Sequence, residues 1–147
     1  MNKQKTLKVG QKVTLKKVFT QKDVTEYADL TGDTNPIFTD ESYIRKTTLK
    51  KAVVPPDLLL AMISNLLGTK LPGRGTNWMK QTLKFPSLAY LGEEITAIVE
   101  ISRIRPAKQL VNLSTICTNP DGQIVCEGEA LVLIKELEQT QNFLARQ

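Results

Sequence analysis

Histidine is missing from this chain of 147 residues, and cysteine occurs only twice. Histidine is the side chain that most readily transfers protons near neutral pH, and it is the commonest metal ligand. Its absence excludes a histidine general base, and two cysteines without histidine do not support a zinc site. The sequence therefore predicts no metal and no cofactor.

Long apolar runs are also missing. No stretch reaches the roughly 20 apolar residues that a membrane-spanning helix needs, and the chain does not open with the charged and apolar regions of a secretory signal. Hydrophobic residues make up 41% and charged residues 24%, as in an ordinary globular domain. We expect one cytoplasmic domain over residues 1–147 with no membrane partner, its core spanning about 7–134 and its polar tail 135–147.

Acidic residues are absent from the first 20 positions, which carry six lysines. A basic stripe can bind nucleic acid, but this one has no interleaved aromatic residues and few arginines. Lysines that protect the exposed edge of a sheet explain the pattern better. No nucleic-acid partner is expected for these residues, which are Lys3, Lys5, Lys8, Lys12, Lys16 and Lys17.

The two cysteines flank the turn "NPDG" at 119–122. Proline at the second position and glycine at the fourth favour a type I turn with a bulge, in a register that does not place Cys117 directly opposite Cys126. Buried, reduced thiols are therefore expected, as in a reducing compartment.

The first half of the chain has patterns typical of a strand and then of helices. Val13 and Leu15 alternate with polar residues in a strand at 11–19, and Thr20 with Asp23 resembles a capping box. A helix follows, with Gly32 as its left-handed stop. Its apolar positions are Val24, Tyr27, Ala28 and Leu30, and a short helix with an irregular loop is expected at 40–52, anchored by Tyr43 and Ile44.

A second helix is predicted within the stretch 53–68, where Pro55 and Pro56 forbid a helix before them and set its first turn, and Gly68 closes it. It is apolar on nearly every side and must therefore be enclosed. Four strands follow at about 77–85, 94–104, 109–118 and 123–135, joined by short turns that favour antiparallel neighbours. This order predicts an α+β hotdog fold, in which a curled antiparallel sheet wraps around a central apolar helix.

The stretch "TGDTNPIF" at 31–38 holds the candidate chemistry. Asp33 and Asn35 stand two residues apart on a turn that Pro36 makes rigid. Both could serve this turn alone, because Asx residues before proline readily accept backbone N–H groups. A carboxylate and an amide in such an arrangement could also begin a catalytic site.

Several segments together resemble the MaoC-like family of (R)-specific enoyl-CoA hydratases and 3-hydroxyacyl dehydratases. They include "FTQKDVTEYADLTGDTNPIF", "LLLAMISNLLGTKLPGRGT" and "LGEEITAIVEISRIR", and the resemblance runs from Leu7 to about Ile134. It implies a hotdog fold and a substrate that is an acyl thioester of coenzyme A or of acyl carrier protein. In the family an Asp, an Asn and a His five positions after the Asp activate water.

Mapped onto this chain, the family's Asp falls on Asp33 and its Asn on Asn35, but its His falls on Phe38, which cannot transfer a proton. The family also places His-Gly before the central helix, where the glycine N–H stabilises the thioester oxyanion. Pro55 and Pro56 stand there, and proline has no N–H. The N–H of Asp57 could substitute, although its carboxylate would lie close to the developing negative charge.

The same mapping implies a set of substrate-binding residues. Phe38 is expected as an apolar wall packed against the central helix, and Leu58 and Met62 are core residues that also line an acyl tunnel. The full set is Phe38, Pro56, Asp57, Leu58 and Met62. Because a curled sheet leaves an open edge, a hotdog dimer is expected, either homomeric or with a catalytic hotdog subunit.

Three hypotheses for function follow. In the first, the chain is a MaoC-like subunit of a (3R)-hydroxyacyl-thioester dehydratase or (R)-enoyl-CoA hydratase system, binds acyl thioesters and has impaired or no catalysis of its own. In the second, it is a slow hydratase that uses Asp33 and Asn35. In the third, it is a non-enzymatic protein that binds an acyl ligand for regulation.

Overall fold

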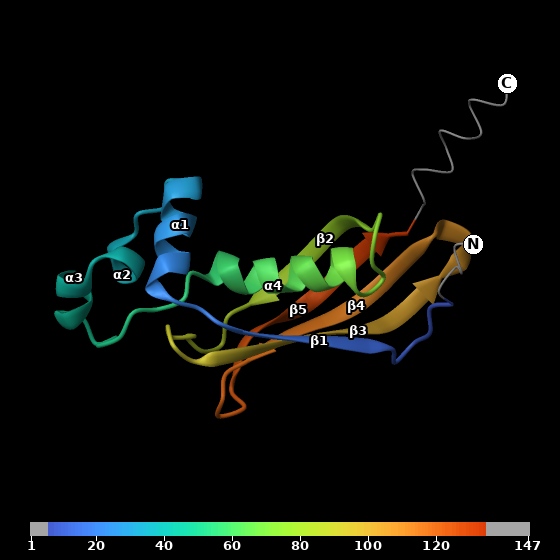
Figure 1. Ribbon diagram of the computed structural model, residues 1–147. Helices are drawn as coiled ribbons and strands as arrows, with labels where there is room; N and C mark the ends of the chain where they lie inside the picture. Colours follow the sequence, from blue (N-terminus) through green and yellow to red (C-terminus); the bar gives the residue numbers. More distant parts are fainter. Residues whose placement is uncertain (1–5, 135–147) are drawn as a thin grey trace, which may run out of the picture.

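A five-stranded antiparallel sheet with one helix packed along its face dominates the computed structural model, which describes residues 6–134 (Figure 1). The strands lie in the order β1-β3-β4-β5-β2. They are β1 (Lys12–Val18), β2 (Asn77–Lys84), β3 (Glu94–Arg105), β4 (Leu110–Thr118) and β5 (Ile124–Leu133). The predicted α+β hotdog architecture is confirmed, and each strand begins and ends within two residues of the predicted bounds.

Four α-helices accompany the sheet, and a 3₁₀ turn at Pro106–Lys108 joins β3 to β4. The long helix α4 lies across the sheet, whereas the three others gather beyond its N-terminal end (Figure 1). They are α1 (Gln21–Thr31), α2 (Pro36–Thr39), α3 (Glu41–Arg45) and α4 (Pro56–Thr69). In the described part of the chain, none of these helices has the length and apolarity to span a membrane.

Helix α1 begins and ends where its sequence predicts. Thr20 and Asp23 form a reciprocal capping box, and Gly32 closes the helix with a left-handed φ of 76°. The backbone N–H of Thr20, and then the charge of Lys17, hold the pKa of Asp23 below its usual value. Val24, Tyr27 and Ala28 are buried as expected, but Leu30 is 87% exposed, so its assignment to the apolar face was wrong.

The first turn of α4 begins at Pro56, as predicted, but the helix passes through Gly68 and ends at Thr69. Within residues 6–134, only one side of α4 is enclosed. Leu59, Met62, Ile63, Leu66 and Leu67 are buried against the sheet, while Asp57, Ala61, Ser64 and Asn65 are exposed. The expectation of a helix enclosed on every side was therefore wrong, because the polar residues at 57, 64 and 65 share the outer face.

The core lies between α4 and the sheet. Alternate residues of β3 and β4 are fully buried, since successive side chains of a strand point to opposite faces. Each fully buried Leu, Ile or Val contributes roughly 1.5–3 kcal/mol relative to exposure. The largest of these side chains are Ile63, Leu66, Leu67, Leu71, Ile95, Ile101 and Leu113.

The strand β1 forms one edge of the sheet, and its lysines face solvent. Lys16 and Lys17 make long ion pairs of 3.8 and 3.9 Å with Glu94 and Asp23. This confirms that Lys12, Lys16 and Lys17 lie on a protected sheet edge, whereas Lys3 and Lys5 fall outside the described residues, as does the predicted tail at 135–147.

The register of the two cysteines differs from the prediction. A bulge does occur next to the turn, but it lies between Cys117 and Thr118, so Cys117 and Cys126 are direct partners on neighbouring strands. Both thiols are buried and free, as expected. The hydrogen bond with Cys126, together with burial, raises the pKa of Cys117, which keeps that thiol protonated.

Gly128 lets β2 approach β5 more closely than any side chain would allow. A Cβ atom built at this position would overlap the backbone carbonyl of Thr82 on β2. We expect Gly128→Ala to destabilise the fold by about 1–3 kcal/mol, the usual cost of overpacking, and urea unfolding would measure it.

Gly68→Ala is the matched control for that substitution. Gly68 lies inside α4 and nothing would contact its added Cβ atom, so alanine should stabilise the protein by about 0.5–1 kcal/mol. If Gly128→Ala left the unfolding midpoint unchanged, the close approach of β2 and β5 would be wrong.

Candidate active site

The candidate site forms where α4 begins, beside the C-terminal half of α1 and the turn that follows it. Pro55 precedes the helix with φ −52° and ψ 128°, and Pro56 occupies its first position. The fixed φ of proline suits this geometry, but neither residue offers a backbone N–H at the positive end of the helix dipole. These two positions therefore cannot donate a backbone hydrogen bond to a developing oxyanion.

Tyr27 joins the two carboxylates of the site. Its hydroxyl oxygen lies 2.9 Å from Asp33 Oδ2 and 2.8 Å from Asp57 Oδ2. The phenol has a single proton, so at any moment it donates to only one of the two carboxylates. Three elements, α1, the turn after it and the first turn of α4, thus meet at a single oxygen atom.

The electrostatic surroundings keep Tyr27 neutral. Its side chain is only 8% exposed, and desolvation followed by the hydrogen bonds to Asp57 and Asp33 raises the pKa of the phenol. Ionisation would place a third negative charge beside two carboxylates. Tyr27 therefore remains a hydroxyl donor and acceptor at neutral pH.

The turn at 33–37 is held by a chain of local hydrogen bonds. The Asp33 N–H donates to Thr31 Oγ1 at 3.1 Å, and Asp33 Oδ1 accepts the Asn35 N–H at 3.2 Å. Asn35 Oδ1 in turn accepts the Ile37 N–H at 3.2 Å and caps α2. Asp33 is half-buried and Asn35 is exposed, so each residue supports the turn and still faces outward.

Phe38 lies away from the face of α4. It is buried in a small cluster with Val24 and Val53, to which Ile37, Leu49, Tyr90 and Leu91 contribute. The expectation that its ring packs against the central helix was therefore wrong. Its burial comes from α1 and from the segment that precedes α4.

The remaining predicted binding residues occupy different places around α4. Asp57 is exposed and meets Asp33 through Tyr27. Met62 is 3% exposed in the main core beneath the helix, and Pro56 is half-buried at its start. Leu58 is half-buried on a different side and lines a surface depression.

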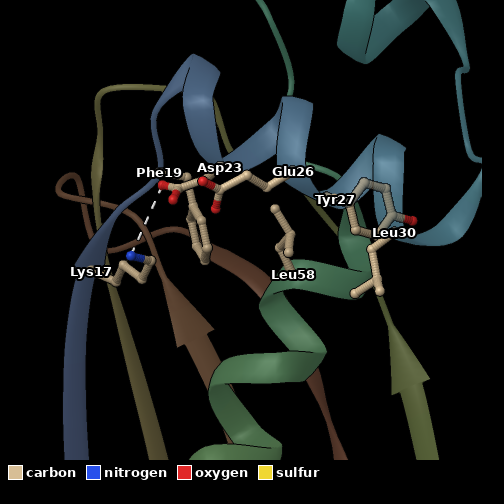
Figure 2. A pocket seen from close by; sticks show the side chains of 7 residues that line it. All are labelled: Lys17, Phe19, Asp23, Glu26, Tyr27, Leu30 and Leu58. Carbon is tan, nitrogen blue, oxygen red and sulfur yellow. Dashed lines mark ion pairs between the residues drawn. The ribbon is translucent and has the colours of Figure 1, made fainter.

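That depression, about 240 Å³ in volume, lies between β1, α1 and α4. Figure 2 shows Phe19 and Leu58 at its apolar centre and Tyr27 on its wall, with the tyrosine hydroxyl directed away from Lys17. Lys17 pairs with Asp23 at its rim, where Glu26 and the exposed Leu30 complete the lining. Tyr27 thus separates an apolar hollow from the two carboxylates.

Sequence reasoning identified Asp33 and Asp57 but missed the residue that connects them. Tyr27 is predicted only as a core position of α1, because its helical spacing matches that role. It is 6 residues from Asp33 and 30 from Asp57. No local pattern relates the three, since only the packing of α1 against α4 brings them together.

Comparison with known proteins identifies the family. The model of the MaoC-like domain matches residues 2–118. An (R)-specific enoyl-CoA hydratase of Rhodospirillum rubrum is 37% identical over 128 residues, covering 87% of this chain and 88% of the relative. A 3-hydroxybutyryl-CoA dehydratase of Methylorubrum extorquens is 32% identical over 140 residues, covering 95% and 88%.

Among solved structures, the (R)-hydratase from A. caviae, described as involved in PHA biosynthesis, superposes with a TM-score of 0.86 at 34% identity. The superposition covers 89% of this chain and 99% of that structure. This solved structure thus shares the sheet and helix arrangement described above. The chain belongs to the MaoC-like family of hotdog proteins.

Proposed function

We propose that this protein binds acyl thioesters as a hotdog subunit of an (R)-enoyl-thioester hydratase or (3R)-hydroxyacyl-thioester dehydratase system, and that its own turnover is slow or absent. The observation that carries this proposal is the altered start of α4. There Pro56 stands at the position that the family resemblance gives to the N–H donor, while Phe38 in α2 stands at the position that it gives to the base, and Asp33 matches the family's aspartate.

The proposed substrate follows from the printed names of the relatives. Two of them act as an (R)-specific enoyl-CoA hydratase and a 3-hydroxybutyryl-CoA dehydratase. Both names describe water added to, or removed from, an acyl-coenzyme A. We propose the same class of substrate for the present chain, with the acyl group carried by either coenzyme A or acyl carrier protein.

Slow turnover follows from the chemistry of the site. A positioned acid–base group contributes about 10²- to 10⁴-fold to rate, and an oxyanion donor contributes about 10²- to 10³-fold. Phe38 is a buried hydrocarbon ring and Pro56 carries no N–H. Asp33 is the group that remains to take a proton from water.

The first test separates binding from turnover. Calorimetric titration with butyryl-CoA, which cannot be hydrated, should give saturable binding tighter than that of coenzyme A alone. Hydration of crotonyl-CoA, followed by the loss of enoyl absorbance, should be about 10²-fold or more below that of a relative with histidine. Asp33→Asn should remove the remaining rate. Failure to bind either butyryl-CoA or a butyryl carrier protein would contradict the proposal.

The second test restores the two missing groups. The double variant Phe38→His with Pro56→Gly should raise crotonyl-CoA hydration by about 10²-fold or more, because it supplies a proton-transfer group and a backbone donor. Phe38→Asn with Pro56→Gly is the matched control, since asparagine is polar but does not titrate. Equal rates for the two variants, both folded by circular dichroism, would show that position 38 does not face the reaction.

We also propose that the chain forms a hotdog dimer through β2. This strand is the second edge of the sheet, and an uncovered edge favours pairing with another chain. The register shift between Trp78 and Lys80 leaves Met79 56% exposed, and Phe85 and Leu88 just beyond β2 are 45% and 44% exposed. These apolar side chains suit a covered surface.

Sedimentation at micromolar concentration should therefore give twice the chain mass. Met79→Glu should shift the protein toward monomer, because it adds charge to the proposed interface, whereas Val9→Glu, at another exposed apolar position, should leave the dimer intact. A monomeric parent that becomes dimeric only with a histidine-containing hotdog protein would instead favour the heteromeric arrangement.

A further inference from the structure

The contacts of Tyr27 suggest a role for Asp57 that the family motif does not assign, and the inference rests on the proposed function. Asp57 is exposed at the second position of α4, yet its Oδ2 lies 2.8 Å from the Tyr27 hydroxyl. The same hydroxyl lies 2.9 Å from Asp33 Oδ2. Both distances lie within the range for proton transfer between positioned groups.

A hydroxyl group between two carboxylates can accept a proton from one and donate its own to the other. Tyr27 has this arrangement, since its oxygen contacts both aspartates. The residue is buried and its phenol stays neutral, so such an exchange is concerted: Tyr27 gives up its proton on one side as it accepts another on the other side. A chain of hydrogen bonds with these distances also polarises each of its members.

We propose that Asp33, Tyr27 and Asp57 form a proton relay that replaces the missing histidine in the residual hydration reaction. Asp33 takes a proton from water while the water oxygen bonds to C3 of the enoyl thioester, and the electron pair of the double bond moves toward the thioester carbonyl. Asp33 then passes a proton to the Tyr27 oxygen as Tyr27 donates its own to Asp57. Asp57 delivers that proton to C2.

This sequence leaves every protein group as it began. One water is added across the double bond, with its oxygen on C3 and a proton on C2, and both aspartates return to carboxylates. Tyr27 is a positioning and relay residue, whereas Asp33 and Asp57 are the groups that meet the reactants. The dehydration reaction follows the same steps in reverse.

A competing role for Asp57 predicts the opposite effect on the hydration rate. Its carboxylate lies at the end of α4 where negative charge would develop on the thioester, so it could simply disfavour the reaction. Removing the charge would then raise the rate. The direction of change in Asp57→Asn therefore distinguishes a relay from an electrostatic obstacle.

The experiment compares kcat for crotonyl-CoA hydration among four proteins: the parent, Asp57→Asn, Tyr27→Phe and the double variant. The relay predicts a loss of at least about 10-fold in each single variant, as expected for one acid–base group. The double variant should be no slower than either single one, because residues that act as a unit are not additive. Asp57→Glu should keep part of the rate.

Two controls make the outcome specific. Asp29→Asn changes an exposed carboxylate on α1, and Tyr43→Phe changes an exposed phenol on α3. Both variants should keep the parental rate. Butyryl-CoA should bind all variants with similar affinity. Tyr27 is buried, so Tyr27→Phe can lower the melting temperature. Asp57 is exposed, so Asp57→Asn should leave the fold intact and still tests the relay.

Several results would overturn the relay. An unchanged or higher rate in Asp57→Asn would do so, as would a parent that binds butyryl-CoA but shows no hydration sensitive to Asp33→Asn. The second result leaves the proposed function as a binding subunit intact. Loss of butyryl-CoA binding by the parent would instead remove the proposed function and the relay together.

Discussion

The packing of α4 on the sheet is the constraint on which the rest of this structure depends. Five apolar side chains of the helix are buried against alternate residues of β3 and β4, and this fixes both the position and the rotation of the helix. The first turn of α4 then lies where α1 and its following turn can reach it. The site therefore takes its geometry from the core rather than from its own few polar contacts.

At the start of α4, several features act on the same charge balance. Prolines at 55 and 56 remove N–H donors from the positive end of the helix, and Asp57 places a carboxylate there. A second carboxylate, Asp33, lies on the other side of Tyr27. The site is consequently rich in proton acceptors and poor in groups that stabilise an enolate, which is consistent with binding accompanied by slow chemistry.

The sheet combines two kinds of edge. Both edge strands carry exposed lysines, but β2 also exposes Met79 at its bulge, and Phe85 and Leu88 are exposed just beyond its end. Gly128 lets the backbone of β2 approach β5 closely at Thr82, whereas Met79 lies at the register shift of the same strand. This exposed apolar surface is the basis for proposing association through β2.

The sequence by itself determined the strands, the capping box of α1, the proline start of α4 and the absence of histidine, because these depend on local spacing, turn chemistry and residue identity. Tertiary structure decided the direct pairing of Cys117 with Cys126, the separate cluster around Phe38 and the contacts of Tyr27. Moving a bulge by one residue changes which residues pair across two strands, as at Cys117 and Cys126. Tyr27 and Asp57 are 30 positions apart in the chain and meet only because α1 packs near the start of α4. Local patterns carry no record of those contacts, since the packing of α1 and α4 creates them.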